Sequence, residues 1–245
     1  MRVLICFEYF GKNYCGLQAQ PNLKTVQGEL ESVLSGFFAQ SIEIVASGRT
    51  DAGVHAMGQC AHFDCKQKNN FKIENLPLAV NNQMNDIKIV WAKEVDENFS
   101  ARFDVKKKTY LYKLYLSQNE CPTKQNLALR VNKNIDVGAM KEACKTLVGR
   151  HDFSAFRASG AQNKDDNVRT IFSARLIKRF DELHFEICGS GFLYNMVRII
   201  VGTLVEIGAK KLNKNAFLTA FSSKSRKDLG QTAPPDGLYL KKVDY

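Results

Sequence analysis

The first half of the chain alternates short apolar runs with segments whose apolar residues recur every three or four positions. The apolar runs predict strands at residues 3–9, 42–45, 59–63 and 87–95. One helical face is predicted from Val26, Leu30, Val33, Leu34, Phe37 and Phe38. A second helix should begin near Asn75, because Pro77 suits a first helical turn. This order favours an α+β unit with helices on one face of a mostly antiparallel sheet.

The second half repeats the pattern less regularly. Its apolar runs predict strands at residues 109–117, 170–178, 183–188 and 238–243. Helices are expected over 137–147, capped by Asp136, and from 192 to about 207. The polar stretch 162–167 is expected to be a loop.

The two halves differ in charge. We place their boundary near Asp104, ahead of the lysines at 106–108, which gives an N-terminal α+β subdomain over 1–104 and a basic C-terminal one over 105–245. The first carries 10 Lys and Arg against 12 Asp and Glu, and the second carries 25 against 13. The whole basic excess therefore favours a polyanion-facing surface in the second half, the alternative being a solvated lysine-rich surface. Two similar halves also imply a cleft between them, where ligands usually bind.

Three features bear on where the protein works. The apolar start at residues 3–7 is too short for a secretory signal and is followed by Glu8. We find no run of about eighteen uncharged apolar residues, so no membrane span is expected. The chain has 7 cysteines, an odd number without paired spacing, which suits a reducing compartment. We therefore expect a cytoplasmic protein.

The connection between the predicted strands at 42–45 and 59–63 carries the densest chemistry in the chain. Residues 47–58 read Ser-Gly-Arg-Thr-Asp-Ala-Gly-Val-His-Ala-Met-Gly. At about eleven residues this loop is longer than a common hairpin turn. Its glycines permit backbone shapes that could hold the Asp51 carboxylate at the floor of a cleft, with Arg49 two residues before it. The alternative is ordinary turn chemistry, because aspartate caps nearby backbone amides.

The whole string resembles the catalytic loop of the tRNA pseudouridine synthase A family. The residues that carry the likeness are Gly48-Arg49-Thr50-Asp51-Ala52-Gly53-Val54-His55, Gly58-Gln59 and His62-Phe63. The resemblance implies that Asp51 is the nucleophile and that Arg49 serves catalysis and substrate binding. It also implies that His55 and Gln59 contact the substrate. A nucleophilic carboxylate must be ionised, and a nearby cation favours the ionised form.

Arg198 is the only charge in the apolar segment 192–205. A guanidinium amid that much apolar surface needs an anionic partner, because an unpaired buried charge costs several kcal/mol. The alternatives are that it reaches a solvent edge or pairs with a structural carboxylate. The segment resembles a second motif of the same family, in which this arginine faces the catalytic aspartate. The resemblance therefore implies that Arg198 is catalytic, and we hypothesise an Asp51–Arg198 pair.

Tyr110 follows three lysines in a predicted strand and shares its face with Tyr112. Core packing is the ordinary role for aromatic residues in strands. The preceding residues 100–103, however, resemble the family segment that leads into a substrate-contacting tyrosine. The likeness assigns Tyr110 to stacking on an everted base and leaves Tyr112 as the packing residue.

The likeness extends over residues 7–245. Residues 7–18 resemble an N-terminal family motif, although Phe10 stands where an aspartate is usual and Leu17 where a tryptophan is usual. Residues 237–240 also match, which implies that Leu238 contacts the substrate. These two departures concern the role of the first loop, residues 10–18.

The family resemblance implies a specific activity. The fold expected is two similar α+β subdomains whose mostly antiparallel sheets join into one extended sheet, with the catalytic cleft between them. The reaction expected is isomerisation of uridine to pseudouridine at positions 38, 39 and 40 of the tRNA anticodon stem-loop. The partners expected are tRNA and a second copy of the chain in a homodimer, without metal or organic cofactor.

Two alternatives remain open from the sequence. An RNA-binding module without catalysis is one, although we find no aromatic signature of an RNA-recognition domain. A zinc-dependent hydrolase built on His55, Cys60 and His62 is the other. With Cys65 these residues fit no common structural zinc spacing, and Cys60 and His62 are expected to be inward strand residues.

Overall fold

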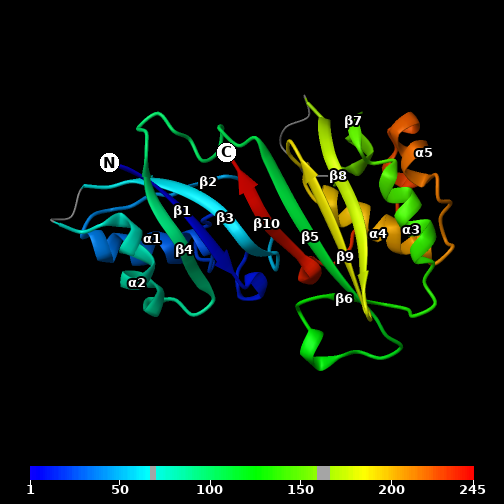
Figure 1. The fold of residues 1–245 in the computed structure, drawn as a ribbon, viewed down its shortest axis with the longest axis horizontal. Helices are drawn as coiled ribbons and strands as arrows, with labels where there is room; N and C mark the ends of the chain where they lie inside the picture. Colours follow the sequence, from blue (N-terminus) through cyan, green and yellow to red (C-terminus); the bar gives the residue numbers. More distant parts are fainter. Residues whose placement is uncertain (67–69, 159–165) are drawn as a thin grey trace. The chain divides into compact units, whose positions relative to one another are not determined.

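The computed structural model describes residues 1–66, 70–158 and 166–245. Its contacts divide the chain into two compact units (Figure 1). Unit 1 comprises Met1–Lys106 and Tyr239–Tyr245, and unit 2 comprises Lys107–Leu238. The predicted division assigned all of 105–245 to the second half. The last strand belongs to unit 1 instead, because it pairs with a strand of that unit.

Unit 1 is an α+β unit built on a mostly antiparallel sheet. Its elements are β1 Arg2–Tyr9, α1 Val26–Phe38, β2 Val45–Ala46, β3 His55–Asp64, α2 Leu76–Val80, β4 Ile87–Val95 and β10 Leu238–Asp244. The strand order is β4-β1-β3-β10, with β2 beside β3. β1 is antiparallel to β3 and to β4, whereas β10 is parallel to β3.

The core of unit 1 lies between this sheet and α1. Helix α1 buries Val26, Leu30 and Leu34, each with 0% exposed surface, as the helical spacing predicts. Thr25 caps its first turn by accepting a hydrogen bond from the Gly28 amide at 3.2 Å. Strand β1 is buried on both faces from residue 3 to residue 7, so the core of unit 1 extends through the sheet.

The sequence predicted most of these elements and placed one boundary wrongly. The strands at 3–9 and 87–95, the first helix and the start of the second helix are confirmed. The strand predicted at 42–45 is wrong, since only Val45–Ala46 pair with β3, although Ile42 and Ile44 are buried. Strand β3 begins at His55, because residues 55 and 56 pair with β10 from the other end of the chain.

Unit 2 is a second α+β unit. Its elements are β5 Lys107–Leu116, β6 Leu129–Val131, α3 Val137–Lys145, β7 Gly149–Asp152, β8 Val168–Arg179, β9 Glu182–Gly189, α4 Met196–Gly208 and α5 Ala216–Ser223. The strand order is β5-β9-β8-β7, all antiparallel, with β6 parallel to β5. Helix α3 contacts α4 and β8 (Figure 1). Alternate residues of β9 are buried, as expected for a strand with helices on one face.

The predictions for unit 2 hold where local signals are strong. The strands at 109–117, 170–178 and 183–188 are confirmed, as is the Asp136 cap, which accepts from the Ala139 amide at 2.9 Å. The long helix begins at Met196 and not at 192, because Asn195 adopts the left-handed conformation, with φ 59°. The stretch 162–167 lies mostly outside the described residues.

Short segments complete the described fold. Its 3-10 helices are Gly11–Asn13, Ile73–Asn75, Asn81–Gln83, Pro122–Lys124, Ser154–Phe156, Arg226–Asp228 and Pro235–Gly237. Among the described residues, no helix has the length and apolar character needed to cross a membrane. The predicted α+β class with a mostly antiparallel sheet is confirmed, since the described ladders are antiparallel except β3–β10 and β5–β6.

Candidate active site

Asp51 lies in the loop of residues 47–54, which joins β2 to β3 and is braced from inside by Gln59. The Ser47 hydroxyl donates to the Gln59 side-chain oxygen at 2.6 Å, and the Gln59 amide donates to the Gly48 carbonyl at 3.0 Å. The Gln59 side chain has 0% exposed surface. The resemblance assigned Gln59 to substrate contact, whereas this geometry supports a positioning role, because both ends of the amide hold the loop.

The middle of the loop is fixed through Thr50. Its hydroxyl and the Tyr9 hydroxyl at the end of β1 are hydrogen-bonded at 2.7 Å. Its carbonyl accepts from the Leu17 amide at 3.2 Å. Burial raises the pKa of the Tyr9 phenol, so this group remains protonated and keeps its hydrogen bond over the working pH range. The Asp51 carbonyl then accepts from the Val54 amide at 3.1 Å, which closes a tight turn around the half-buried aspartate.

Two glycines of the first loop lie directly against the backbone of the Asp51 loop. A Cβ atom added to Gly11 would lie 1.9 Å from the Val54 carbonyl oxygen, closer than any side chain allows. One added to Gly16 would lie 2.9 Å from the Thr50 carbonyl oxygen, and Gly16 also has φ +97°. The first loop therefore holds the Asp51 loop in place. Sequence reasoning missed this contact, and its signal was the pair of glycines in the N-terminal motif.

His55 supports the far end of the loop. Its ring lies between Phe10 and Tyr239, with centroid distances of 5.0 and 4.7 Å. Its Nδ1 atom accepts from the Gly11 amide at 3.0 Å, and the residue has 1% exposed surface. Phe10, the departure from the family pattern, thus packs on the histidine.

Like Gln59, two further residues expected to contact the substrate are enclosed by the fold. His55 is stacked between aromatic rings, so its position supports a structural role in the loop. Leu238 has 5% exposed surface at the start of β10. Arg49, by contrast, is exposed next to Thr50, and Asp51 is half-buried. Of these predicted residues, Arg49 and Asp51 are therefore the ones that the structure leaves at least partly exposed.

Tyr110 and Tyr112 of β5 differ as expected. Tyr112 has 0% exposed surface and donates its hydroxyl to the Pro234 carbonyl at 2.7 Å, so its assignment to packing is confirmed. Burial raises the pKa of this phenol. Tyr110 is half-buried and meets Phe192 edge to face, with ring centroids 5.1 Å apart. Its ring is therefore oriented by an aromatic neighbour while part of its surface stays open.

Arg198 projects from the first turn of α4 and is held by neutral oxygen atoms of its own unit. Its Nε donates to the Ala233 carbonyl at 2.7 Å, and Nη1 donates to the Asn195 side-chain oxygen at 2.7 Å. The Ala233 amide donates in return to the Arg198 carbonyl at 3.1 Å. These bonds fix the plane of the guanidinium, which is half-buried.

The zinc hypothesis has no ligand set in the described part of the chain. No group of three His, Cys, Asp or Glu side chains there could hold a metal ion. The Nδ1 atom of His62 accepts from the Ala101 amide at 3.1 Å, and burial lowers the pKa of this histidine. Cys60 and His62 are buried strand residues, as expected.

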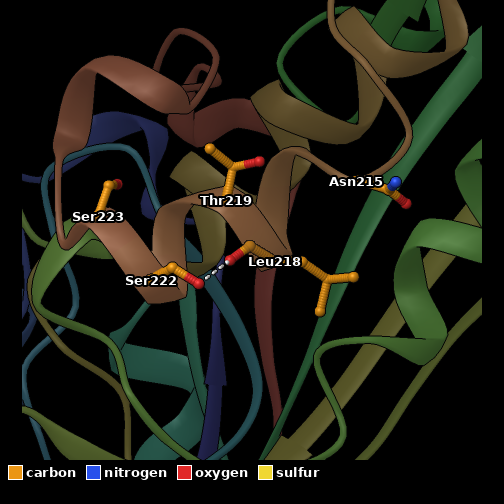
Figure 2. Close-up of a pocket in the computed structure, with 5 residues that line it drawn as sticks. All are labelled: Asn215, Leu218, Thr219, Ser222 and Ser223. Atoms are coloured by element: carbon orange, nitrogen blue, oxygen red, sulfur yellow. Dashed lines mark hydrogen bonds between the residues drawn. The ribbon is translucent and has the colours of Figure 1, made fainter.

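A shallow hollow on α5 is lined by none of the predicted site residues. Figure 2 shows that its lining consists of Asn215, Leu218, Thr219, Ser222 and Ser223. The Ser222 hydroxyl donates to the Leu218 carbonyl at 3.2 Å within the helix. The lining holds no charged group, so we assign no chemistry to it.

The chain matches the tRNA pseudouridine synthase family over residues 5–104 and 143–245. It is 41% identical to the tRNA pseudouridine synthase A of Exiguobacterium sp. over 100% of the chain and 98% of that protein. It is 45% identical to the protein of the same name from Halalkalibacterium halodurans over 97% of the chain and 90% of that protein. It is 43% identical to the tRNA pseudouridine synthase A of Geobacillus sp. (strain WCH70) over 100% of the chain and 98% of that protein.

The family model covers the braced Asp51 loop and Arg198 but not Tyr110, whereas the alignment with the Exiguobacterium protein spans the whole chain. The protein is thus an isomerase. It belongs to the tRNA pseudouridine synthase family.

The contact between the first loop and the Asp51 loop gives a stability prediction. Gly11→Ala forces a methyl group onto the Val54 carbonyl, and overpacking of this kind costs about 1–3 kcal/mol. Urea unfolding followed by the fluorescence of Trp91, the only tryptophan and a residue of unit 1, should therefore show a lower midpoint. The control is Gly36→Ala in α1, where an added Cβ atom would have nothing within 4 Å. This change should raise the free energy of unfolding by about 0.5–1 kcal/mol and therefore raise the midpoint. Equal midpoints for the two variants would contradict the contact.

Proposed function

We propose that this protein isomerises uridine to pseudouridine at positions 38, 39 and 40 of the tRNA anticodon stem-loop, with Asp51 as the nucleophile. The observation that carries the proposal is the braced loop, which keeps a half-buried carboxylate accessible while its backbone is fixed at Gly48, Thr50 and Val54. Family membership supplies the substrate class. A preorganised nucleophile needs such a fixed backbone, because small displacements of a reacting group lower the rate strongly.

The reaction requires that the target uridine leave its stack. A base inside folded RNA is not reachable, so it is flipped out at a cost of a few kcal/mol. Asp51 then attacks either the ribose C1′ or the uracil C6, and the C1′–N1 bond breaks. The uracil rotates in place, its C5 bonds to C1′, and the bond between the Asp51 carboxylate and the substrate breaks. C5 loses its proton and N1 gains one, so the product has the same atoms as the substrate. Water must stay out, because it would hydrolyse the intermediate.

Tyr110 is proposed to contact the flipped base. The edge-to-face contact with Phe192 orients its ring, and the residue is only partly buried, which supports a stacking role. Its hydroxyl can hydrogen-bond or relay a proton, and it is our candidate for the acceptor of the C5 proton.

Arg198 is proposed to supply the cation that keeps the Asp51 carboxylate ionised, with Arg49 as a second cation in the loop. The support for Arg198 is its fixed guanidinium plane, held by Ala233 and Asn195. A guanidinium presents several donors in a rigid fork, so it can keep these two bonds and still offer N–H groups to a carboxylate. This pairing is implied by the family likeness and remains a proposal.

The basic second half is proposed to bind the tRNA backbone. Residues 105–245 carry 25 Lys and Arg against 13 Asp and Glu, and phosphate contacts of this kind release counterions. Binding should therefore weaken as salt rises. We further propose, from the family likeness, a homodimer that works in the cytoplasm without metal or organic cofactor.

The role of Asp51 is tested by tritium release from tRNA labelled at uracil C5. Asp51→Asn keeps the size of the side chain but removes the negative charge, so release should fall to background while tRNA binding persists. Glu43→Gln, an exposed carboxylate in the same unit, should keep full release. Equal release from wild type and Asp51→Asn, or none from wild type, would refute the proposal.

The role of Arg198 is tested by Arg198→Lys in the same assay. Lysine keeps the charge but not the planar fork, so release should drop by about a hundredfold, as when one positioned donor is lost from an active site. The matched control is Arg226→Lys in the same unit, whose guanidinium also bonds a loop through Leu229 and Thr232. If both variants lose the same activity, loop support explains the effect. If neither does, Arg198 is not catalytic.

A further inference from the structure

Two cysteines that the proposed reaction does not use lie opposite one another in unit 1. Cys6 of β1 pairs in register with Cys60 of β3, and the strands are antiparallel. All 7 cysteines of the chain are free thiols. In the strand ladders that the structure describes, this is the one register position that brings two cysteines together.

The hydrogen-bond pattern shows that this is a close pair. At the start of the ladder, Met1 and Cys65 exchange both of their backbone hydrogen bonds, at 3.0 and 3.1 Å. Bonded and non-bonded pairs alternate along an antiparallel ladder, and Cys6 lies an odd number of residues from Met1 in an unbroken register. Cys6 and Cys60 therefore form a non-hydrogen-bonded pair. Consistently, the Cys60 carbonyl turns away from β1 to accept from the Ser47 amide at 2.8 Å.

A non-hydrogen-bonded pair suits a disulfide. Its Cα atoms are about 4.5 Å apart, and disulfides span Cα distances of roughly 4.4–6.8 Å. The distance lies at the short end of that range.

The two thiols differ in their readiness to react. The neighbouring Cys60 thiol holds the pKa of Cys6 below its ordinary value. The Cys6 side chain, followed by burial, raises the pKa of Cys60. Cys6 has 9% exposed surface against 3% for Cys60, and its other neighbour across the sheet is Trp91, which is 38% exposed. Cys6 is therefore the more acidic and the more accessible of the two.

We propose that Cys6 and Cys60 form a reversible dithiol–disulfide site, oxidised by hydrogen peroxide and reduced by small thiols. The Cys6 thiolate attacks one peroxide oxygen, the O–O bond breaks and hydroxide leaves, which gives a sulfenic acid. The Cys60 sulfur then attacks the Cys6 sulfur. The S–O bond breaks, the S–S bond forms and water leaves. Two thiols and one peroxide thus give one disulfide and two waters, and the two electrons lost by sulfur reduce the peroxide.

The site adjoins the brace of the Asp51 loop. Consecutive residues of a strand point to opposite faces, so Gln59 serves the loop on one face of β3 while Cys60 meets Cys6 on the other. The Ser47 amide bonds to the Cys60 carbonyl, so the loop and the thiol pair share the same stretch of backbone.

The test is thiol counting and peptide mapping after mild peroxide treatment of the whole protein. Two of the 7 thiols should become resistant to alkylation in denaturant, and digestion should give one peptide that joins Cys6 to Cys60. Dithiothreitol should restore both thiols. Cys60→Ser should lose the linked peptide and leave Cys6 as a sulfenic acid. The control Cys65→Ser removes a buried cysteine just after β3 and should keep the peptide that joins Cys6 to Cys60.

Three results would overturn the proposal. One is alkylation of all 7 thiols after peroxide treatment. Another is a linked peptide that involves other cysteines. The third is further oxidation of Cys6 in the wild type without a link to Cys60. The wild-type peptide map decides among these outcomes even if the serine variants fold poorly.

Discussion

The structure of this site depends on direct contact between two backbones in unit 1. The first loop lies on the Asp51 loop, with glycine at two points of close backbone approach, Gly11 and Gly16. Because the first loop continues from β1, the place of the aspartate is set by the core strand and not by the loop alone. Tyr9 at the end of that strand adds a side-chain bond to Thr50. A long loop thereby gains the fixed geometry that a nucleophile needs.

Buried polar groups make this arrangement specific. Gln59 and His55 are almost wholly enclosed, and each forms hydrogen bonds with the loops that surround Asp51. Within the described residues, every buried side-chain nitrogen or oxygen atom has a hydrogen-bond partner. Loss of one partner would leave the other unsatisfied at a cost of about 1–3 kcal/mol, so the network favours a single loop conformation.

Sequence patterns predicted the elements that depend on local signals. The face of α1 and the Asp136 cap of α3 follow from spacing and side-chain chemistry within a few residues. The start of β3 was missed because it depends on β10, far away in the sequence, and the short strands β6 and β7 and helix α5 were missed because their signals are weak. The string at residues 47–58 predicted Asp51 and Arg49 as candidate catalytic residues. It could not show that His55 and Gln59 face inward, since burial is set by tertiary packing.

The central claim is that the braced loop presents Asp51 as the nucleophile toward a flipped uridine. Its most direct measurement is mass spectrometry of the protein after incubation with an anticodon stem-loop RNA that carries 5-fluorouridine at the target position. Fluorine replaces the C5 hydrogen that must leave, so the last step is blocked and the intermediate is trapped. We expect an RNA adduct on the peptide that contains Asp51. An adduct on a different side chain, or none while the unmodified RNA is converted, would contradict the account.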